Sequence, residues 1–193
     1  MFLRGNMKTC SFFGHRDTPK TDELKNKVRE IVERLIVEEG VDTFLFGSRS
    51  NFDELCHIVV TELQKKYSHI RRVVYLCKHE TACLVGAGMD LERQIKEITG
   101  RDVRVREFEE IKKSDRVNSA GRAAYVERNQ EIINISNFCV FYYNLNHLSP
   151  KRKNSKEDIG ERQLKSGTQL IFDYVHKRKK LGELKGFFNL MDK

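Results

Sequence analysis

The chain has 193 residues, 39% of them hydrophobic and only two of them proline, and we expect one compact domain over residues 1–193 with a single core. It has no apolar run long enough to cross a bilayer, and its first ten residues lack the apolar stretch of a signal peptide, so we expect a soluble cytoplasmic protein that does not bind membranes. Five irregularly spaced cysteines argue against a disulfide framework and fit free thiols in a reducing compartment.

The net charge of +8 favours an anionic partner, from a nucleotide phosphate to nucleic acid. Two basic runs contain much of this excess, KRKNSK at 151–156 and HKRKK at 176–180. Neither run has interleaved aromatic residues that would stack on bases. We therefore interpret both as solvated surface, with weak electrostatic binding of nucleic acid at most.

The first half of the chain alternates predicted strands and helices. An apolar run at 10–14 ends in glycine and predicts a buried strand, after which Thr21 caps a helix that Gly40 stops. A second strand is predicted at 42–48, and Ser50 and Asp53 have the spacing of a capping box for the next helix. With a third strand at 71–77 the order is βαβαβ. This order predicts an α/β fold with a mostly parallel sheet and helices on both faces.

The second half is less regular at first. Within 78–113, the stretch 89–100 has a helical pattern and 102–108 alternates like an exposed edge strand. A helix from about 119 to 136 leads into a strongly β-prone run at 138–143, which predicts a central strand. A polar loop at 144–165 precedes a helix at 166–180, and 186–190 predicts the last strand. One apolar face of that helix is expected to contain Leu170, Ile171, Tyr174 and Val175.

Three glycines stand where a strand or loop passes into a helix, so we expect them at one edge of the sheet: Gly14, Gly47 and Gly167. In open parallel sheets ligands bind at that edge, and the helix N-termini there favour phosphate. Ser166 and Thr168 add hydroxyl groups beside the third glycine.

Simpler explanations apply to several residues near these turns. Asp53 is a helix cap before it is a ligand contact, His15 is by itself an ordinary loop histidine, and Gly47 fits a tight turn. Tyr142 and Tyr143 are ordinary strand aromatics, although the one nearer the strand end could stack on a base. Three other residues suggest metal ligands but lack a fourth at a recognisable spacing, so we predict no metal site: Cys77, His79 and Cys83.

Most of the chain, apart from about 81–116, resembles the YspA/YpsA-like branch of the SLOG superfamily, which also contains the DNA-processing Smf/DprA proteins and the Lonely Guy hydrolases. The resemblance lies in CSFFGHR at 10–16, FLFGSRSNFDELCHIVVTELQKKY at 44–67, VVYL at 73–76, ERNQEIINISNFCVFYYN at 127–144, SGTQLIFDYVHKRKK at 166–180 and GFFNL at 186–190. It implies a modified Rossmann-type sheet that binds nucleotides or nucleotide-derived ligands at the strand ends, in a homodimer and without a cofactor. Carried over by motif, it implies these ligand-binding residues: Gly14, His15, Arg16, Gly47, Ser48, Asn51, Asp53, Arg128, Asn129, Ser166, Gly167 and Thr168.

The chain departs from the family pattern at two places. Relatives commonly have a glycine-glycine-alanine turn after the second strand, where this chain has Gly47-Ser48-Arg49-Ser50. An aspartate is usual before the penultimate strand, where this chain has Asn137, and the change removes a charge from the expected site.

These observations predict a binding or sensor domain for a nucleotide or an NAD- or ADP-ribose-derived ligand. The first alternative is a nucleoside 5′-monophosphate N-glycosidase of the Lonely Guy type, which needs a reacting carboxylate. Those enzymes have a glutamate three residues after the glycine-threonine pair, where this chain has Ile171, so whether it is an enzyme stays open and no catalytic residue is assigned. Glu127 or Asp53 could supply the acid instead. The second alternative is single-stranded DNA binding, supported mainly by the charge.

Overall fold

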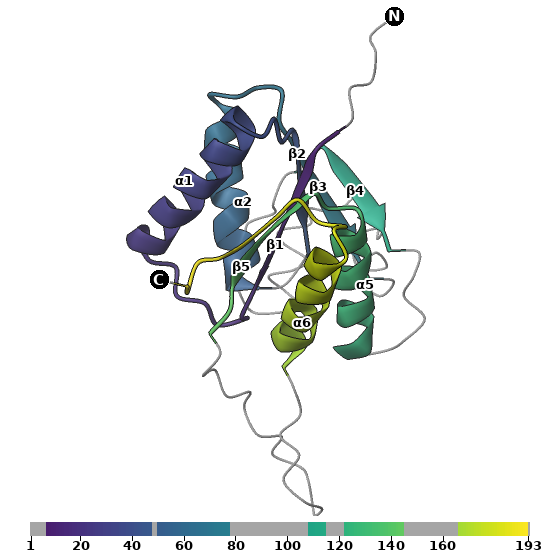
Figure 1. Cartoon of the computed structure of the whole chain (residues 1–193). Coiled ribbons are helices and arrows are strands. Elements are labelled where there is room, and N and C mark those ends of the chain that lie inside the picture. Colours follow the sequence, from purple (N-terminus) through teal and green to yellow (C-terminus); the bar gives the residue numbers. More distant parts are fainter. Residues whose placement is uncertain (1–6, 48–49, 78–107, 115–121, 145–165, 193) are drawn as a thin grey trace, which may run out of the picture.

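A computed structural model describes residues 7–47, 50–77, 108–114, 122–144 and 166–192 (Figure 1). In these ranges the strands and helices are, in chain order, β1 (Thr9–Gly14), α1 (Asp22–Val37), β2 (Thr43–Phe46), α2 (Asn51–Gln64), β3 (Arg71–Leu76), β4 (Glu110–Lys113), α5 (Arg122–Asn134), β5 (Phe138–Tyr142), α6 (Gly167–Lys180) and β6 (Gly186–Asn189).

The strands form one six-stranded sheet in the order β4-β3-β2-β1-β5-β6, and every neighbouring pair is parallel. The predicted α/β fold is therefore confirmed. From β1 the chain first builds outward through β2, β3 and β4, and it then returns to the other side of β1 with β5 and β6. The direction of building thus reverses between β1 and β5. In Figure 1 the carboxyl ends of β1 and β5 lie at the lower side of the view, where α6 begins.

Helices cover both faces of the sheet, as predicted. Figure 1 shows α1 and α2 on one side and α5 and α6 on the other. Successive side chains of a strand point to opposite faces, so Phe12 and Phe46 pack in the core beneath α1 and α2. Their neighbours Phe13 and Leu45 pack in the core beneath α5 and α6. Because both faces are buried, the interior strands are largely apolar instead of alternating with polar residues.

The helix ends follow local chemistry. The Thr21 side chain accepts a 3.2 Å hydrogen bond from the Leu24 amide, and Ser50 accepts one of 3.0 Å from the Asp53 amide. Both predicted caps are confirmed. Gly40, just beyond α1, has a φ of 67°, in the left-handed region that favours glycine after a helix.

One sequence-based expectation is wrong, and two others fall wholly or largely outside the described residues. The edge strand β4 lies at 110–113, after the predicted run at 102–108, of which only Phe108 is described. Leu170 is 37% exposed, so its assignment to the apolar face of α6 is wrong, whereas Ile171 and Val175 are buried. The predicted helix at 89–100 lies outside the described residues. Within the described ranges, no helix is long and apolar enough to span a membrane.

Candidate functional site

The first turn of the site follows β1, and its glycine is explained by packing. A Cβ atom placed on Gly14 would lie 2.5 Å from the Cβ of Phe52, the second residue of α2. The group that comes close to this backbone is therefore a core side chain. Since Gly14 has no positive φ, its role is to admit Phe52 and to bring the start of α2 against the end of β1.

His15 and Arg16 have different surroundings. His15 is buried, and its Nε2 accepts a 3.1 Å hydrogen bond from the backbone amide of Asn144. A ring nitrogen that accepts is not protonated, so His15 ties the end of β5 to the first turn and does not offer Nε2 as a charged donor. Arg16 has an exposed side chain, and its carbonyl accepts a 3.0 Å hydrogen bond from the Asn51 amide. The cation of the first turn that can reach a ligand is thus Arg16.

The second turn follows β2 and is held by two buried charged residues. Asp53 accepts a 3.0 Å hydrogen bond from the Gly47 amide, and its own amide donates to Ser50. The guanidinium of Arg128 approaches from α5, because a Cβ on Gly47 would lie 2.9 Å from its Nη2. The lack of a side chain at Gly47 therefore leaves room for the guanidinium of Arg128. Ser48, also predicted for the site, lies outside the described residues.

Arg128 links three parts of the edge. Its Nη1 donates a 3.0 Å hydrogen bond to the carbonyl of Tyr75 at the end of β3, and its Nε donates to the side chain of Asn129. The guanidinium also lies 5.6 Å from the ring centre of Tyr125. Buried in this way, Arg128 holds the β2 and β3 ends against α5, and Asn129 orients it.

The third turn is the start of α6. Ser166 caps the helix by accepting a 3.0 Å hydrogen bond from the Gln169 amide. The amides of Gly167 and Thr168, in the first turn, have no partner within the helix and point outward from its N-terminus. Thr168 donates from Oγ1 to the carbonyl of Gly14 at 3.3 Å, which places this turn directly beside the first. No atom of the described residues lies within 4 Å of a Cβ built on Gly167, so space is open there.

The three turns therefore meet at the carboxyl edge of the sheet, as their sequence positions predicted. Hydrogen bonds join the first turn to the start of α2 and to the start of α6. The residues that face outward are Arg16, Asn51 and the amides at the start of α6, while His15, Asp53 and Arg128 are buried supports. Sequence patterns did not indicate the contributions of Phe52, Tyr75 and Asn144, because an apolar side chain and two backbone groups have no motif.

The two tyrosines at the end of β5 differ in exposure. Tyr143 is buried and packs 4.4 Å, centre to centre, from Phe172 of α6. Tyr142 is half-buried and stacks at 5.8 Å on Phe52. Of the two, Tyr142 is the ring that an incoming base could reach from the strand end.

Asn137 lies at the opposite end of β5, so the expectation that it alters the site is wrong. Its Oδ1 accepts a 2.8 Å hydrogen bond from the Thr9 amide, and its own amide donates to Thr9 Oγ1. The side chain thus joins the amino ends of β1 and β5. The loss of a charge at this position therefore concerns the start of the sheet, away from the edge where the three turns meet.

The described carboxylates considered for hydrolysis, and Ile171 in place of the glutamate, have different surroundings. Ile171 is 1% exposed and belongs to the core beneath α6, and Asp173 is exposed on the other side of that helix. Asp53 is engaged by the Gly47 amide, and Glu127 is half-buried on α5.

The three residues considered as metal ligands in the sequence can be placed only in part. Cys77 is buried, with its Sγ 3.7 Å from the Ala124 carbonyl, while His79 and Cys83 lie outside the described residues. The ranges that the structure describes contain no group of three or more metal-ligating side chains.

A scan against protein-family models and a search of curated proteins both give no match for this chain. The resemblance to the SLOG superfamily therefore stays a prediction.

Proposed function

We propose that the chain binds a nucleotide or an NAD- or ADP-ribose-derived ligand at the carboxyl edge of the sheet, between β1 and β5. The observation that best supports this site is the reversal of strand order between these two strands. In open α/β sheets the crevice outside such a reversal is where ligands bind, because the connections leave it in opposite directions.

The groups around this point suit a phosphorylated ligand. The amides at the start of α6, which have no partner within the helix, and the positive end of its dipole favour a phosphate. Arg16 supplies an exposed cation from the adjacent turn, and Tyr142 supplies a half-buried ring for a base. Arg16 and the start of α6 are also among the contacts that the SLOG resemblance implies, and we propose membership of that superfamily on the same basis.

A thermal shift screen with nucleotides, dinucleotides, ADP-ribose and single-stranded DNA tests the proposal. A ligand that binds only the folded chain raises its melting temperature by mass action, with about 2.7 kcal/mol of added stability at a hundredfold excess over Kd. We expect a shift with at least one nucleotide-derived compound. If none of these compounds produces a shift, the proposal is wrong.

Arg16→Ala locates the site. Loss of one charge-assisted hydrogen bond weakens binding roughly tenfold or more. We expect the fold to be retained, because the Arg16 side chain is exposed and its carbonyl keeps the hydrogen bond from Asn51. Thr168→Ala is expected to weaken binding too, since it loosens the start of α6. Arg71→Ala is the matched control, because Arg71 is an exposed arginine at the amino end of β3. Equal ligand affinity of Arg16→Ala, Thr168→Ala and the parent would place the ligand elsewhere.

We also propose that the chain forms a homodimer, as the family resemblance implies. Light scattering at micromolar protein concentration is expected to give twice the 22.7 kDa mass of the chain. A mass equal to one chain under these conditions would contradict the dimer without affecting the ligand site.

A further inference from the structure

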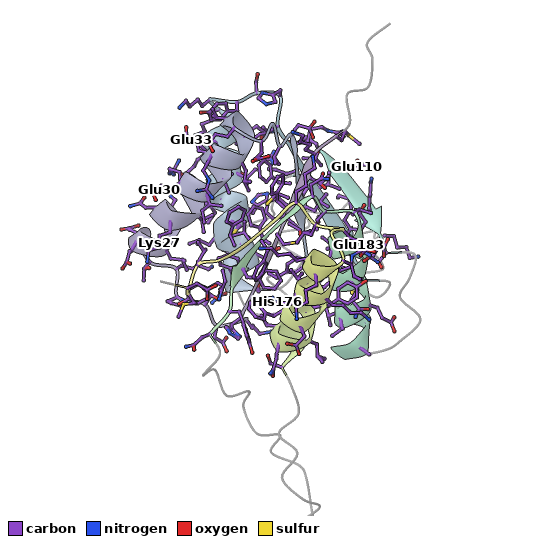
Figure 2. The ribbon with its side chains drawn as sticks, viewed as in Figure 1. Lys27, Glu30, Glu33, Glu110, His176 and Glu183 are labelled. Carbon is purple, nitrogen blue, oxygen red and sulfur yellow. The ribbon has the colours of Figure 1, made fainter. Side chains whose placement is uncertain are left out.

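The second half of α6 and the edge strand β6 form a surface on which cations and aromatic rings occur together. Figure 2 shows His176 on α6, facing outward, with Glu183 in the turn that follows the helix. We call this the α6–β6 surface and define it by Phe172, His176, Lys177, Lys179, Lys180 and Phe187.

The rings of this surface are in mutual contact. The His176 ring centre lies 4.6 Å from that of Phe172 and 4.9 Å from that of Phe187. Both phenylalanines are only half-buried, while Phe141 beneath them is fully buried. The rings therefore rest on the core on one side and are accessible from solvent on the other.

One cation lies beside these rings, and others are on the same turn of the helix. Lys179 Nζ lies 5.9 Å from the ring centre of Phe187, and Lys177 and Lys180 are exposed on the same last turn. Two carboxylates lie nearby in the described residues: Glu183, which is 2.8 Å from the Arg178 guanidinium, and Asp173, exposed one turn earlier. With Arg178 included, four cations in the last turn of α6 outnumber these two carboxylates, so the surface is net positive.

We propose that the α6–β6 surface binds a single-stranded polynucleotide. Proteins that bind single strands combine a row of cations for the phosphates with aromatic side chains on which bases stack. The basic run at 176–180 has no aromatic residue of its own, and the sequence therefore predicted weak, purely electrostatic binding. The fold changes this expectation, because Phe172 stands one turn before the run and Phe187 is brought beside it by the pairing of β5 with β6.

The cations of the surface are separate from the proposed ligand site. Lys179 stands eleven positions after Thr168 in α6, which is about 16 Å along a helix. Phe172, four positions after Thr168, is the part of the surface nearest to that site. A single strand on the second half of α6 and a small ligand at its N-terminus can therefore bind independently, and Arg16→Ala is expected to leave polynucleotide binding unchanged.

Fluorescence anisotropy with labelled 20-nucleotide dT and rU strands, and with a DNA duplex of equal length, tests this proposal at about 50 mM salt, where phosphate contacts are strong. We expect tighter binding of at least one single strand than of the duplex. Comparing the affinities for the dT and rU strands shows whether the surface prefers single-stranded DNA or RNA.

Three variants assign the binding to this surface. Phe187→Leu removes one stacking ring and is expected to weaken single-strand binding roughly five- to a hundredfold. Changing Lys177 and Lys180 together to Ser alters only exposed side chains, and each lost phosphate contact reduces the slope of log affinity against log salt by about 0.7. Lys27→Ser is the matched control, since Figure 2 shows Lys27 on α1, well away from α6.

Several outcomes would overturn the proposal. One is equal affinity for duplex and single strand with no effect of Phe187→Leu, which would indicate nonspecific attraction of a polyanion. Another is tighter binding of vesicles containing anionic lipid than of either strand. If Phe187→Leu fails to fold, as seen in its circular dichroism, the double lysine variant decides: affinity as high as that of Lys27→Ser would contradict the proposal.

Discussion

At the scale of single residues, the two glycines beside the open edge differ in what surrounds them. A methyl group on Gly14 would penetrate Phe52, whereas one on Gly167 meets no described atom within 4 Å. We therefore expect Gly14→Ala to lower the free energy of unfolding by at least about 1–3 kcal/mol, the usual cost of overpacking. Gly167→Ala, at the first position of α6, is expected to change it by less than about 0.5 kcal/mol.

Urea denaturation of the two variants gives this comparison directly, because the chemical change is the same at both sites. Similar midpoints for Gly14→Ala and Gly167→Ala would contradict the assignment of Gly14 to packing. The ligand affinity of Gly167→Ala can also be measured in the thermal shift screen. If phosphate binds the amides at the start of α6, this folded variant is expected to lose affinity.

The buried position of Ile171 leads to a prediction about catalysis. An apolar side chain can neither transfer a proton nor stabilise positive charge on ribose, and Ile171 is fixed in the core. We expect no enzymatic release of base when the protein is incubated with AMP, GMP, CMP and UMP and the products are separated by chromatography. Multiple turnovers that disappear in Asp53→Asn or Glu127→Gln would instead establish a hydrolase.

Residue roles were predictable only where the chemistry is local. The caps Thr21 and Ser50 were predicted, because a cap depends on residues three positions apart. The role of His15 was not, since its partner is a backbone amide 129 positions away. The motif predicts a histidine at the end of β1, but the backbone that follows β5 determines that His15 accepts a hydrogen bond instead of donating one.

At the scale of elements, the edge strand β4 depends on one largely buried ion pair. Arg72 of β3 is buried, and its guanidinium lies 2.5 Å from the carboxylate of Glu109, just before β4. Thr61 accepts another hydrogen bond from Arg72, and Gln64 donates to Glu109. Glu109→Ala leaves a buried charge without its partner. We expect a loss of about 2–3 kcal/mol, less than for a fully buried pair because Glu109 is 30% exposed.

Chemical denaturation at pH 7 measures this loss. Replacing the pair together, as Arg72→Met with Glu109→Leu, is expected to recover much of it, since no unpaired charge then remains. A double variant as unstable as Glu109→Ala would indicate that the hydrogen bonds of Arg72 to Thr61 matter more than the charge.

The same carboxylate makes stability depend on pH. Partial burial opposes ionisation of Glu109, but hydrogen bonds from Arg72 and Gln64 outweigh it and lower its pKa to about 2. An unfolded glutamate titrates near 4.3, so the contribution of Glu109 is complete above about pH 5 and is lost as the pH falls towards 2. Between pH 5 and 3 we expect the parent to lose more stability than Glu109→Gln. Parallel pH profiles in urea denaturation would contradict this assignment.

Strand β4 also marks a limit of pattern-based prediction. Its residues alternate between half-buried and exposed positions, and Ile111 is 60% exposed. Such a four-residue edge strand has almost no hydrophobic signal of its own. It is fixed by Glu109 and by pairing with β3, and these are contacts between segments distant in sequence. The interior strands, by contrast, were predictable because both of their faces are buried.

At the scale of the whole molecule, the order of the strands could be derived only in part. The βαβαβ start and apolar strands predicted a parallel sheet with two covered faces, since those features follow from hydrophobic pattern and crossover handedness. The placement of β5 beside β1 could not be derived, because it depends on the matching of Phe13 with Phe141 across the sheet. That placement creates the reversal of strand order, and with it the site.

The same strand order predicts how stability is distributed through the molecule. Strands β1 and β5 have a partner on each side and side chains buried on both faces, whereas β4 and β6 stand at the edges with half-buried or exposed residues. Opening an edge strand exposes little apolar surface, while opening β1 separates both cores. In native-state hydrogen exchange, we expect the paired amides of β1 and β5 to exchange at least about tenfold more slowly than those of β4 and β6. Exchange measured at increasing denaturant concentration separates the two kinds of opening. The exchange rate of β1 amides is expected to rise as steeply as global unfolding does, and that of β4 amides is expected to change very little with denaturant. If β4 instead exchanges as slowly as β1, the sheet opens as one unit, and the ion pair of Arg72 and Glu109 stabilises the edge as firmly as burial stabilises the centre.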